Sequence, residues 1–376
     1  GSPSLLINYT YDSLNRVQTR DYSDGTTPPV TYCYDGRTWN GSVGGCNGTP
    51  AEPSKQRLTE VGSTISRTSY AYNAAGQVTG NMQTTAGQSF SFGYTYTAAM
   101  TLATETYPSG RVMTTAYDDA GRPKYLKGQN GSVVTYYAGN LSSSIGYASH
   151  GAMSSMMMGN GIQETRTYNS RLQPTVIQAG SLLTILNCYQ TSDGPTNCTS
   201  LPVQANNGNV QKQKITRGGQ SWVQDYTYDT VNRLASATEG STWSQTYGYD
   251  AYGNRWIASS IGVPINPVTP INQTAFDAAT NRLLGTNNYD PRGNLASYGS
   301  YTLSYDGDDK VVSAGGITPS TKYEYDGEGH RVRAHSCSGT STCTPGSGAS
   351  TTVFVYDAFG KLAVESRPDA APSGTS

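Results

Sequence analysis

The stretch YDAYGNRW, from Tyr249 to Trp256, recurs along this chain with small changes. Each copy runs aromatic residue, acidic residue, two variable positions, Gly or Asn, and then a polar and usually basic residue. The copies that follow this order most closely begin at Tyr11 and Asp12, Tyr117 and Asp118, Tyr228 and Asp229, Tyr249 and Asp250, Tyr289 and Asp290, Tyr325 and Asp326, and Tyr356 and Asp357. Their glycines are Gly121, Gly253, Gly293, Gly329 and Gly360. With weaker copies included, most are about 20 to 27 residues apart, which is the length of one supersecondary unit in a stacked array.

The local chemistry of a copy predicts a β-hairpin. The run VQDYTYD, Val223 to Asp229, places Tyr at every second position, as on one face of a strand. The Asp carboxylate is expected to accept hydrogen bonds from backbone N–H groups two or three residues further on, and Gly or Asn tolerates the positive φ of a turn. A second alternating run, such as NRLASAT, then completes the hairpin.

A single hairpin is marginally stable in water, so the hairpins are expected to join edge to edge into one continuous antiparallel sheet. Stacking of like phrases would place Tyr beside Tyr and Asp beside Asp in neighbouring copies. The predicted fold class is therefore all-β. The predicted organisation is a tag scar and lead-in strand at 1–8, one repeat domain of about 15 hairpins at 9–364, and a polar tail rich in Pro and Ser at 365–376.

Composition excludes several classes of partner. The net charge is −1 and the Lys and Arg residues are scattered, so there is no basic stripe for nucleic acid. The most apolar run, LLTIL at Leu182 to Leu186, is far shorter than the roughly 18 residues of a membrane span. The excess of 29 Tyr over 5 Phe predicts broad, half-hydrated surfaces instead of a dense apolar core.

The repeated YD phrase and the return turns YPSGR (Tyr107 to Arg111) and YSDGT (Tyr22 to Thr26) resemble the RHS or YD-repeat proteins of bacteria. The resemblance covers nearly the whole chain. It implies that the sheet curves into a spiral or a partial hollow shell or barrel. Proteins of this family include secreted polymorphic toxins, the C component of Tc toxins, wall-associated proteins and teneurins. The segments that close the repeat region in toxin-type members are not found in this sequence, so no autoproteolytic residue is assigned.

The resemblance implies a non-enzymatic scaffold, a fragment of a secreted or cell-surface shell that encloses or presents a toxin or passenger domain. Its partners would be further repeats of the same protein and a C-terminal passenger, and exposed sheet edges would permit self-association. The alternative is a module for adhesion or carbohydrate binding that acts through its outer face and inserted loops on a surface glycan or protein. With three His and no nucleophile elbow, zinc-protease motif or P-loop, neither an enzyme nor a cofactor is expected.

Six cysteines form three close pairs, Cys33 with Cys46, Cys188 with Cys198 and Cys337 with Cys343, each at or inside an overlong repeat. They predict three local disulfides that clip inserted loops, and hence an oxidising, extracellular location. A zinc site of His330, His335, Cys337 and Cys343 is the competing interpretation, but this spacing fits no standard finger.

Three other groups invite a functional interpretation. Asp306, Asp308 and Asp309 could bind calcium, although they also form a copy of the turn phrase. Met153, Met156, Met157 and Met158 could bind a soft metal, but a strand in an irregular repeat is the simpler interpretation. Trp39, Trp222, Trp243 and Trp256 could form sugar platforms, with ordinary packing as the default.

Overall fold

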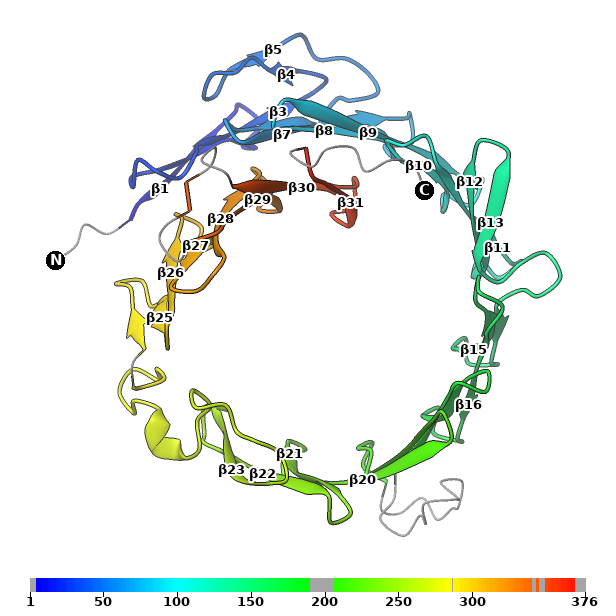
Figure 1. Ribbon diagram of the computed structural model, residues 1–376. Helices are drawn as coiled ribbons and strands as arrows, with labels where there is room; N and C mark the ends of the chain where they lie inside the picture. The colour runs from blue at the N-terminus through cyan, green and yellow to red at the C-terminus, as the bar shows by residue number, and fades with distance from the viewer. Residues whose placement is uncertain (1–4, 190–205, 286, 340–342, 345–348, 369–376) are drawn as a thin grey trace. The chain divides into compact units, whose positions relative to one another are not determined.

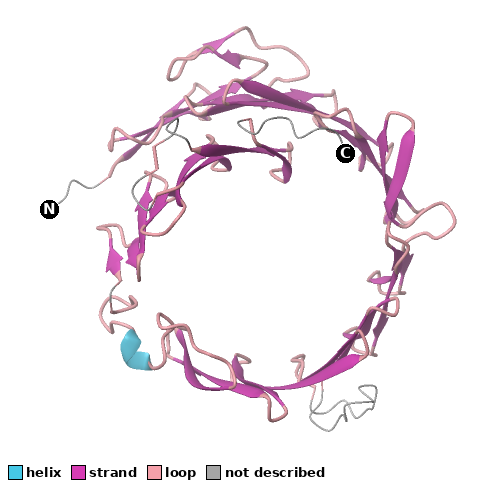
Figure 2. Cartoon of the chain, viewed as in Figure 1, coloured by secondary structure: helices cyan, strands magenta, loops and turns pink. Residues whose placement is uncertain are grey.

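The computed structural model describes residues 5–189, 206–285, 287–339, 343–344 and 349–368. This part of the chain consists of strands and turns, with one turn of 3-10 helix at Gln273–Ala275 (Figure 2). It divides into two compact units (Figure 1). Unit 1 combines Gly1–Met113 with Thr286–Ser376, and unit 2 is Thr114–Gly285. The predicted all-β fold class is confirmed, whereas most of the predicted polar tail lies outside the described residues.

Unit 1 contains two antiparallel sheets and a small hairpin. The first sheet has β1 (Ile7–Tyr11), β2 (Val17–Tyr22), β3 (Val30–Tyr34), β6 (Leu58–Gly62), β7 (Ser66–Tyr72), β8 (Val78–Thr85), β9 (Gln88–Tyr96) and β10 (Leu102–Thr106) in this order. The last sheet has β24 (Asn288–Tyr289), β25 (Leu295–Tyr298), β26 (Tyr301–Tyr305), β27 (Val311–Gly315), β28 (Ser320–Tyr325), β29 (Arg331–Cys337), β30 (Ser350–Tyr356) and β31 (Leu362–Ser366). The hairpin is β4 (Thr38–Trp39) with β5 (Cys46–Asn47).

Unit 2 follows the same plan, and the chain enters it through β11 (Val112–Tyr117). Its first hairpin is β12 (Pro123–Asn130) with β13 (Val133–Ala138). A sheet of ten strands in chain order follows: β14 (Gly146–Tyr147), β15 (Met153–Met157), β16 (Gln163–Tyr168), β17 (Pro174–Ala179), β18 (Leu183–Cys188), β19 (Lys212–Arg217), β20 (Gln220–Tyr228), β21 (Leu234–Glu239), β22 (Trp243–Tyr249) and β23 (Arg255–Ile261). The methionine-rich segment is thus strand β15, which pairs with β16.

The acidic residue of each copy closes the turn of its hairpin. In the copy at Tyr228, Asp229 Oδ1 accepts hydrogen bonds from the N–H groups of Val231 and Arg233 at 3.0 and 2.8 Å. The two donors therefore lie two and four residues after the Asp, not two and three as predicted. Asn232, the residue between the two donors, has φ +65°, which turns its N–H away from the carboxylate. The N–H and side chain of Arg233 hold the pKa of Asp229 below its usual value. The same two backbone hydrogen bonds recur at Asp12, Asp118, Asp250, Asp290, Asp306, Asp326 and Asp357.

The first residue of a copy is called the marker tyrosine here, and in nine copies its hydroxyl joins the hairpin to the one before. The hydroxyl of Tyr249 donates to the carbonyl of Leu234 at 2.8 Å, and Leu234 is the sixth residue after the preceding marker, Tyr228. The same relation holds, at 2.6 to 3.1 Å, for Tyr34 to Val17, Tyr96 to Val78, Tyr147 to Pro123, Tyr168 to Met153, Tyr189 to Pro174, Tyr305 to Leu295, Tyr325 to Val311 and Tyr356 to Arg331. We call this series of hydrogen bonds the tyrosine ladder. It is the regular link between successive copies.

The basic residue of the phrase also reaches the next copy. The guanidinium of Arg233 lies over the ring of Tyr249, 4.4 Å from its centroid, and Arg122 lies over Tyr147 at the same distance. The expectation that marker tyrosines lie beside one another is wrong, since the ring contacts in the described residues do not join two markers. Successive markers are separated by two strands, or about 10 Å, which is too far for ring contact. The basic side chain of one copy and the hydroxyl of the next marker tyrosine span that distance instead.

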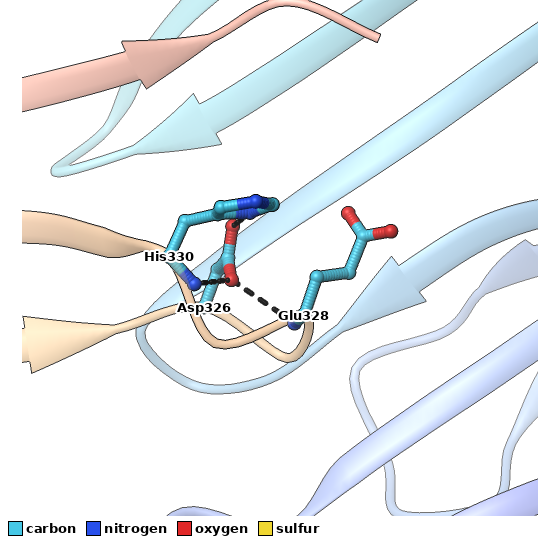
Figure 3. A group of neighbouring side chains, drawn as sticks. All are labelled: Asp326, Glu328 and His330. Carbon is cyan, nitrogen blue, oxygen red and sulfur yellow. Dashed lines mark hydrogen bonds and ion pairs between the residues drawn. The ribbon is translucent and has the colours of Figure 1, made fainter. Parts of the chain in front are cut away.

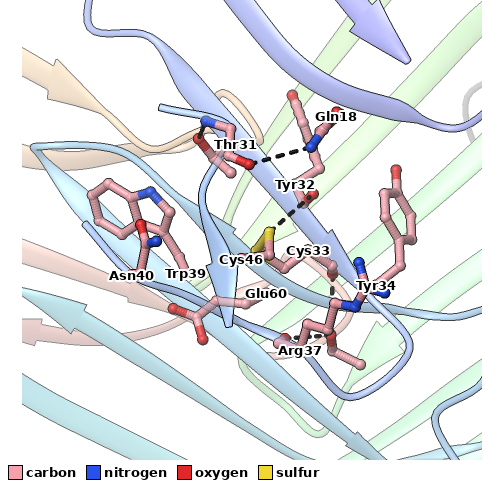
Figure 4. The surroundings of a disulfide bond; sticks show 12 residues. Gln18, Thr31, Tyr32, Cys33, Tyr34, Arg37, Trp39, Asn40, Cys46 and Glu60 are labelled. Atoms are coloured by element: carbon pink, nitrogen blue, oxygen red, sulfur yellow. Dashed lines mark hydrogen bonds between the residues drawn. A yellow bond between two sulfur atoms is a disulfide. The ribbon is translucent and has the colours of Figure 1, made fainter. Parts of the chain in front are cut away.

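An inserted loop covers one face of the first sheet near β3 (Figure 4). Cys33 and Cys46 form a disulfide that holds the loop against its own hairpin. Trp39 lies against Gly62, where a Cβ atom would come within 2.5 Å of its ring. Beneath the loop, the fully buried Glu60 forms an ion pair with Arg67 at 2.9 Å. The insertion therefore packs on the sheet as an ordered cover.

The second disulfide in the described residues joins Cys337 to Cys343, so these two sulfurs are not available to the zinc site considered above. Cys188 is buried at the end of β18, and its predicted partner Cys198 lies outside the described residues. Within the described chain, no helix has the length and apolar character to cross a membrane.

Replacement of Tyr249 by Phe tests the tyrosine ladder. The variant leaves the Leu234 carbonyl without its donor, so we expect the free energy of unfolding to fall by about 1 kcal/mol. Denaturant unfolding followed by circular dichroism measures the loss. Tyr252→Phe is the matched control, because the Tyr252 side chain is 74% exposed at a turn. Equal stabilities of the two variants would contradict a stabilising role of the Tyr249–Leu234 hydrogen bond.

Removal of the Cys33–Cys46 disulfide by a double change to Ser tests the inserted loop. In the chain-entropy model a loop of this size contributes about 3 kcal/mol, and its loss should free Trp39 from Gly62. We expect a red shift of tryptophan emission that disappears when Trp39 is also changed to Phe. If the red shift persists when Trp39 is also changed to Phe, it arises from another tryptophan and does not report release of the loop.

Candidate functional site: the seam between the two sheets of unit 1

The two sheets of unit 1 pack against each other, and we call their contact the seam. Figure 1 shows β29, β30 and β31 beside β7, β8 and β9. The apolar centre of the seam consists of Phe92 and Tyr94 from β9 with Val353 and Val355 from β30, all buried. Around this small centre the buried side chains are mostly polar. Hydrogen bonding therefore carries much of the contact.

Two amide side chains of β8 bond to the backbone of β30. Strand β29 pairs with β30 only as far as Val353, which leaves the following peptide groups free on that side. Gln83, which is 1% exposed, donates to the carbonyl of Phe354 at 2.9 Å and accepts from the N–H of Tyr356 at 3.0 Å. Asn81 donates to the carbonyl of Tyr356 at 3.3 Å. The Gln83 amide thus pairs with two backbone groups of β30 as a neighbouring strand would.

Three successive turns of the last sheet dock on the first sheet through their first variable position. These residues are small: Gly307, Gly327 and Ala358. The N–H of Gly307 donates to the hydroxyl of Thr27 at 2.7 Å, and the N–H of Ala358 donates to the hydroxyl of Tyr94 at 2.9 Å. Small residues are required because the backbone itself makes the contact.

The turn at Gly327 also approaches the first sheet closely. Its carbonyl accepts hydrogen bonds from Arg20 at 3.0 Å and from the hydroxyl of Tyr32 at 3.2 Å. A Cβ atom on Gly327 would lie 2.5 Å from Val30 and 2.6 Å from Val61, both of which are buried. A larger residue therefore fits only if the Val30 and Val61 side chains or the turn itself shift.

The second variable position of these turns completes the docking. Asp308 accepts a hydrogen bond from the hydroxyl of Tyr22 at 2.7 Å, and Glu328 accepts one from Tyr70 at 2.6 Å. Phe359 meets Tyr94 edge to face, with ring centroids 5.2 Å apart. Burial raises the pKa values of Tyr22 and Tyr70, so both phenols stay protonated and donate.

The contacts of Asp308 and its neighbour also account for the acidic run considered for calcium. Asp308 pairs with Arg20 at 3.2 Å as well as with Tyr22. Asp309 pairs with Arg292 at 3.0 Å. Two of the three carboxylates are therefore engaged with cations of the chain.

The turn at Tyr325 gathers the mixed group Asp326, Glu328 and His330 (Figure 3). Asp326 Oδ1 accepts from the N–H groups of Glu328 and His330, and Oδ2 lies 3.3 Å from His330 Nδ1. The hydrogen bond that His330 makes to the Asp326 carboxylate raises the pKa of His330, and burial raises the pKa of Glu328. A cavity of about 300 Å³ opens on the three side chains and is also lined by Tyr70, Gln83 and Tyr356. Hydrogen bonds within the turn and across the seam account for this group without an ion.

Two of the tryptophans considered as sugar platforms pack on glycines. Trp39 lies on Gly62, and Trp256 lies on its cross-strand partner Gly248, where a Cβ atom would come within 2.2 Å of the indole. Both contacts match the default interpretation of these residues, because a glycine in a strand leaves room for an aromatic ring from its neighbour.

Sequence reasoning identified the turn residues but not the seam. Asp326, Gly329, Asp357 and Gly360 were predicted as turn residues, and the structure brings their turns to the seam. The residues that dock occupy the two variable positions of the phrase. The available signal was small: YDGDDK and YDGEGH carry Gly at the first variable position, whereas YDTVNR and YDPRGN carry larger residues.

The described residues define a β-ribbon of Tyr–Asp hairpin repeats in which, within unit 1, the last repeats pack on the first. Comparison of the sequence with protein-family models and with curated proteins found no match. Comparison of the fold with solved structures found Tc toxin components.

The crystal structure of TcdB2-TccC3 with Cdc42 matches over 94% of this chain and 19% of that chain, with a TM-score of 0.70 and 15% identity. The crystal structure of TcdB2-TccC3 gives the same TM-score, identity and coverage of this chain, and 20% of that chain is covered. A Tc holotoxin pore of Photorhabdus luminescens with a TccC3 variant matches at a TM-score of 0.66 and 16% identity, over 94% of this chain and 19% of that chain. The chain therefore has the fold of these toxin components and spans about one fifth of their length. The resemblance to the RHS or YD-repeat proteins is confirmed at the level of fold.

Replacement of Gly327 by Val tests the close approach at the seam. The added atoms overlap Val30 and Val61, and overpacking of this kind costs about 1 to 3 kcal/mol. Denaturant unfolding measures the loss, and Val61→Ala in the same chain should restore part of it. Ala251→Val is the matched control, because Ala251 holds the same turn position on an exposed turn of unit 2. If Gly327→Val and Ala251→Val lower the free energy of unfolding equally, packing across the seam does not restrict the residue at position 327.

Proposed function

We propose that this chain is a non-enzymatic scaffold, a segment of the wall of a shell that encloses or presents a toxin or passenger domain in a secreted or cell-surface protein. The observation that carries the proposal is the seam. A wall that encloses a second protein must hold together where the chain returns to itself. Here the chain leaves unit 1 after Met113 and rejoins it at Thr286, and the seam binds the strands on either side of that excursion.

The fold supports the same proposal. The matched structures are of Tc toxin components, and the likeness extends over nearly all of this chain. The Cys33–Cys46 and Cys337–Cys343 disulfides support an oxidising, extracellular location. The edge strand β1 is exposed at all five residues and is suited to pair with a further repeat of the same protein.

The chemistry of the repeated carboxylates supports a non-enzymatic role. In each regular copy the Asp side chain is occupied by two backbone N–H groups of its own turn, as at Asp118, whose pKa is held below its usual value by the N–H of Arg122. A carboxylate fixed in this way is poorly placed to act as a general acid. We therefore propose that the recurring Asp residues build turns and do no catalysis.

The test uses the natural full-length protein that carries this segment. Under limited proteolysis, a passenger domain enclosed by the wall should be cut much more slowly than the same domain produced alone. Gly327→Val overpacks the seam and should therefore speed cleavage of the passenger, whereas the control Ala251→Val should not. Cleavage of the passenger at the rate of the isolated domain in the unmodified protein would overturn the proposal. Binding of the chain to surface glycans in that case would favour the adhesion alternative.

A further inference from the structure

His330 occupies a position that holds a permanent cation in other copies. The fifth residue after the marker is Arg16, Arg122 or Arg233 in three of them, and each guanidinium lies over the next marker tyrosine at 4.3 or 4.4 Å. In the copy at Tyr325 this residue is His330, whose ring stacks on Tyr356 with centroids 4.6 Å apart and an interplanar angle of 24°. In this copy the side chain that lies over the next marker tyrosine is therefore one that titrates near neutral pH.

The surroundings of His330 make its charge matter at the seam. Asp326 lies 3.3 Å from His330 Nδ1 with its side chain 5% exposed, so a charge on the imidazole compensates a carboxylate that solvent screens little. Glu328, on the same turn, receives the Tyr70 hydroxyl from β7. The turn held by His330 is therefore the turn that presents both Glu328 and Gly327 to the first sheet.

The other charged and titratable groups around His330 come from three elements. Lys310, on the preceding turn, lies close enough that its Nζ would be 2.8 Å from a Cβ atom on Gly329. Asp357, on the following turn, lines the same cavity together with Tyr70 and Tyr356. Arg331 is turned away and lies over Tyr323 and Phe354. Asp326, Glu328 and Lys310 are thus the charged groups that act on His330, and loss of the proton from His330 leaves two carboxyl groups to one cation.

We propose that His330 is a pH-sensitive latch of the seam: its protonated ring holds the Asp326–His330 turn in the shape that docks on β7, and loss of the proton loosens that turn. The proposal concerns the seam alone and does not depend on what the protein encloses.

The direction of the pH dependence follows from the neighbours of His330. Asp326 raises the pKa of His330 above its ordinary value, against the opposing effect of burial. A group with a raised pKa in the folded state contributes stability that is fully present below its unfolded pKa and is lost as the pH rises through the folded value. The seam should therefore be tightest in mild acid and weaken from about neutral pH upward.

The test compares this chain with His330→Arg, which keeps a permanent cation over Tyr356. Hydrogen exchange of the segment 326–331 is measured from about pH 6 to about pH 8.5, with the intrinsic pH dependence of exchange removed. Protection should fall about threefold or more in the unmodified chain and stay nearly constant in His330→Arg. His150→Gln, in unit 2, is the control and should follow the unmodified chain.

Titration of the His330 ring by NMR gives a second measurement, and its first part uses the unmodified chain alone. His330 should titrate above its ordinary value there, and Asp326→Asn should lower the pKa of His330. Titration at or below the ordinary value, or the same pH profile of protection in the unmodified chain and His330→Arg, overturns the proposal.

Discussion

The hydrogen bond from a marker tyrosine to a carbonyl of the preceding copy is the constraint on which the rest of the structure depends. It links the same two positions, the marker and the sixth residue after the previous marker, in both units. Because the donor is a phenol at the end of a rigid ring, the bond fixes both the distance between hairpins and their register. A phenylalanine would fill the same space without fixing either. Nine of the 29 Tyr in the chain serve this requirement.

The seam uses the same phrase for a second purpose. Where a turn faces solvent, its two variable positions accept many residues, including the exposed Val231 and Tyr252. Where a turn meets the first sheet, the first position becomes small and the second becomes a partner for a tyrosine. Most buried groups in the contact are polar and paired, as with Gln83 on β30. An unpaired group at such a place is costly, so a polar contact of this kind favours one register over its alternatives.

The sequence allowed prediction of the elements but not of their long-range contacts. Alternation of tyrosines before Asp229 and positive φ at Asn232 are local properties, and both the hairpins and the turns were predicted from them. The second N–H donor to the Asp carboxylate lies four residues on instead of three, and this spacing depends on the backbone hydrogen bond between Asp229 and Arg233, which residue preferences alone do not specify. The seam joins residues such as Tyr22 and Asp308, 286 positions apart, and a periodic sequence does not indicate which copies meet.

The most direct test of the central claim is the exchange of tyrosine hydroxyl protons with water, followed by NMR. The tyrosine ladder predicts slowly exchanging hydroxyl protons at the marker tyrosines, such as Tyr168, Tyr249 and Tyr325, because each is held by a backbone carbonyl. Tyr252, which is exposed, should exchange at the rate of free tyrosine. Equally fast exchange at the marker tyrosines and at Tyr252 would contradict the account.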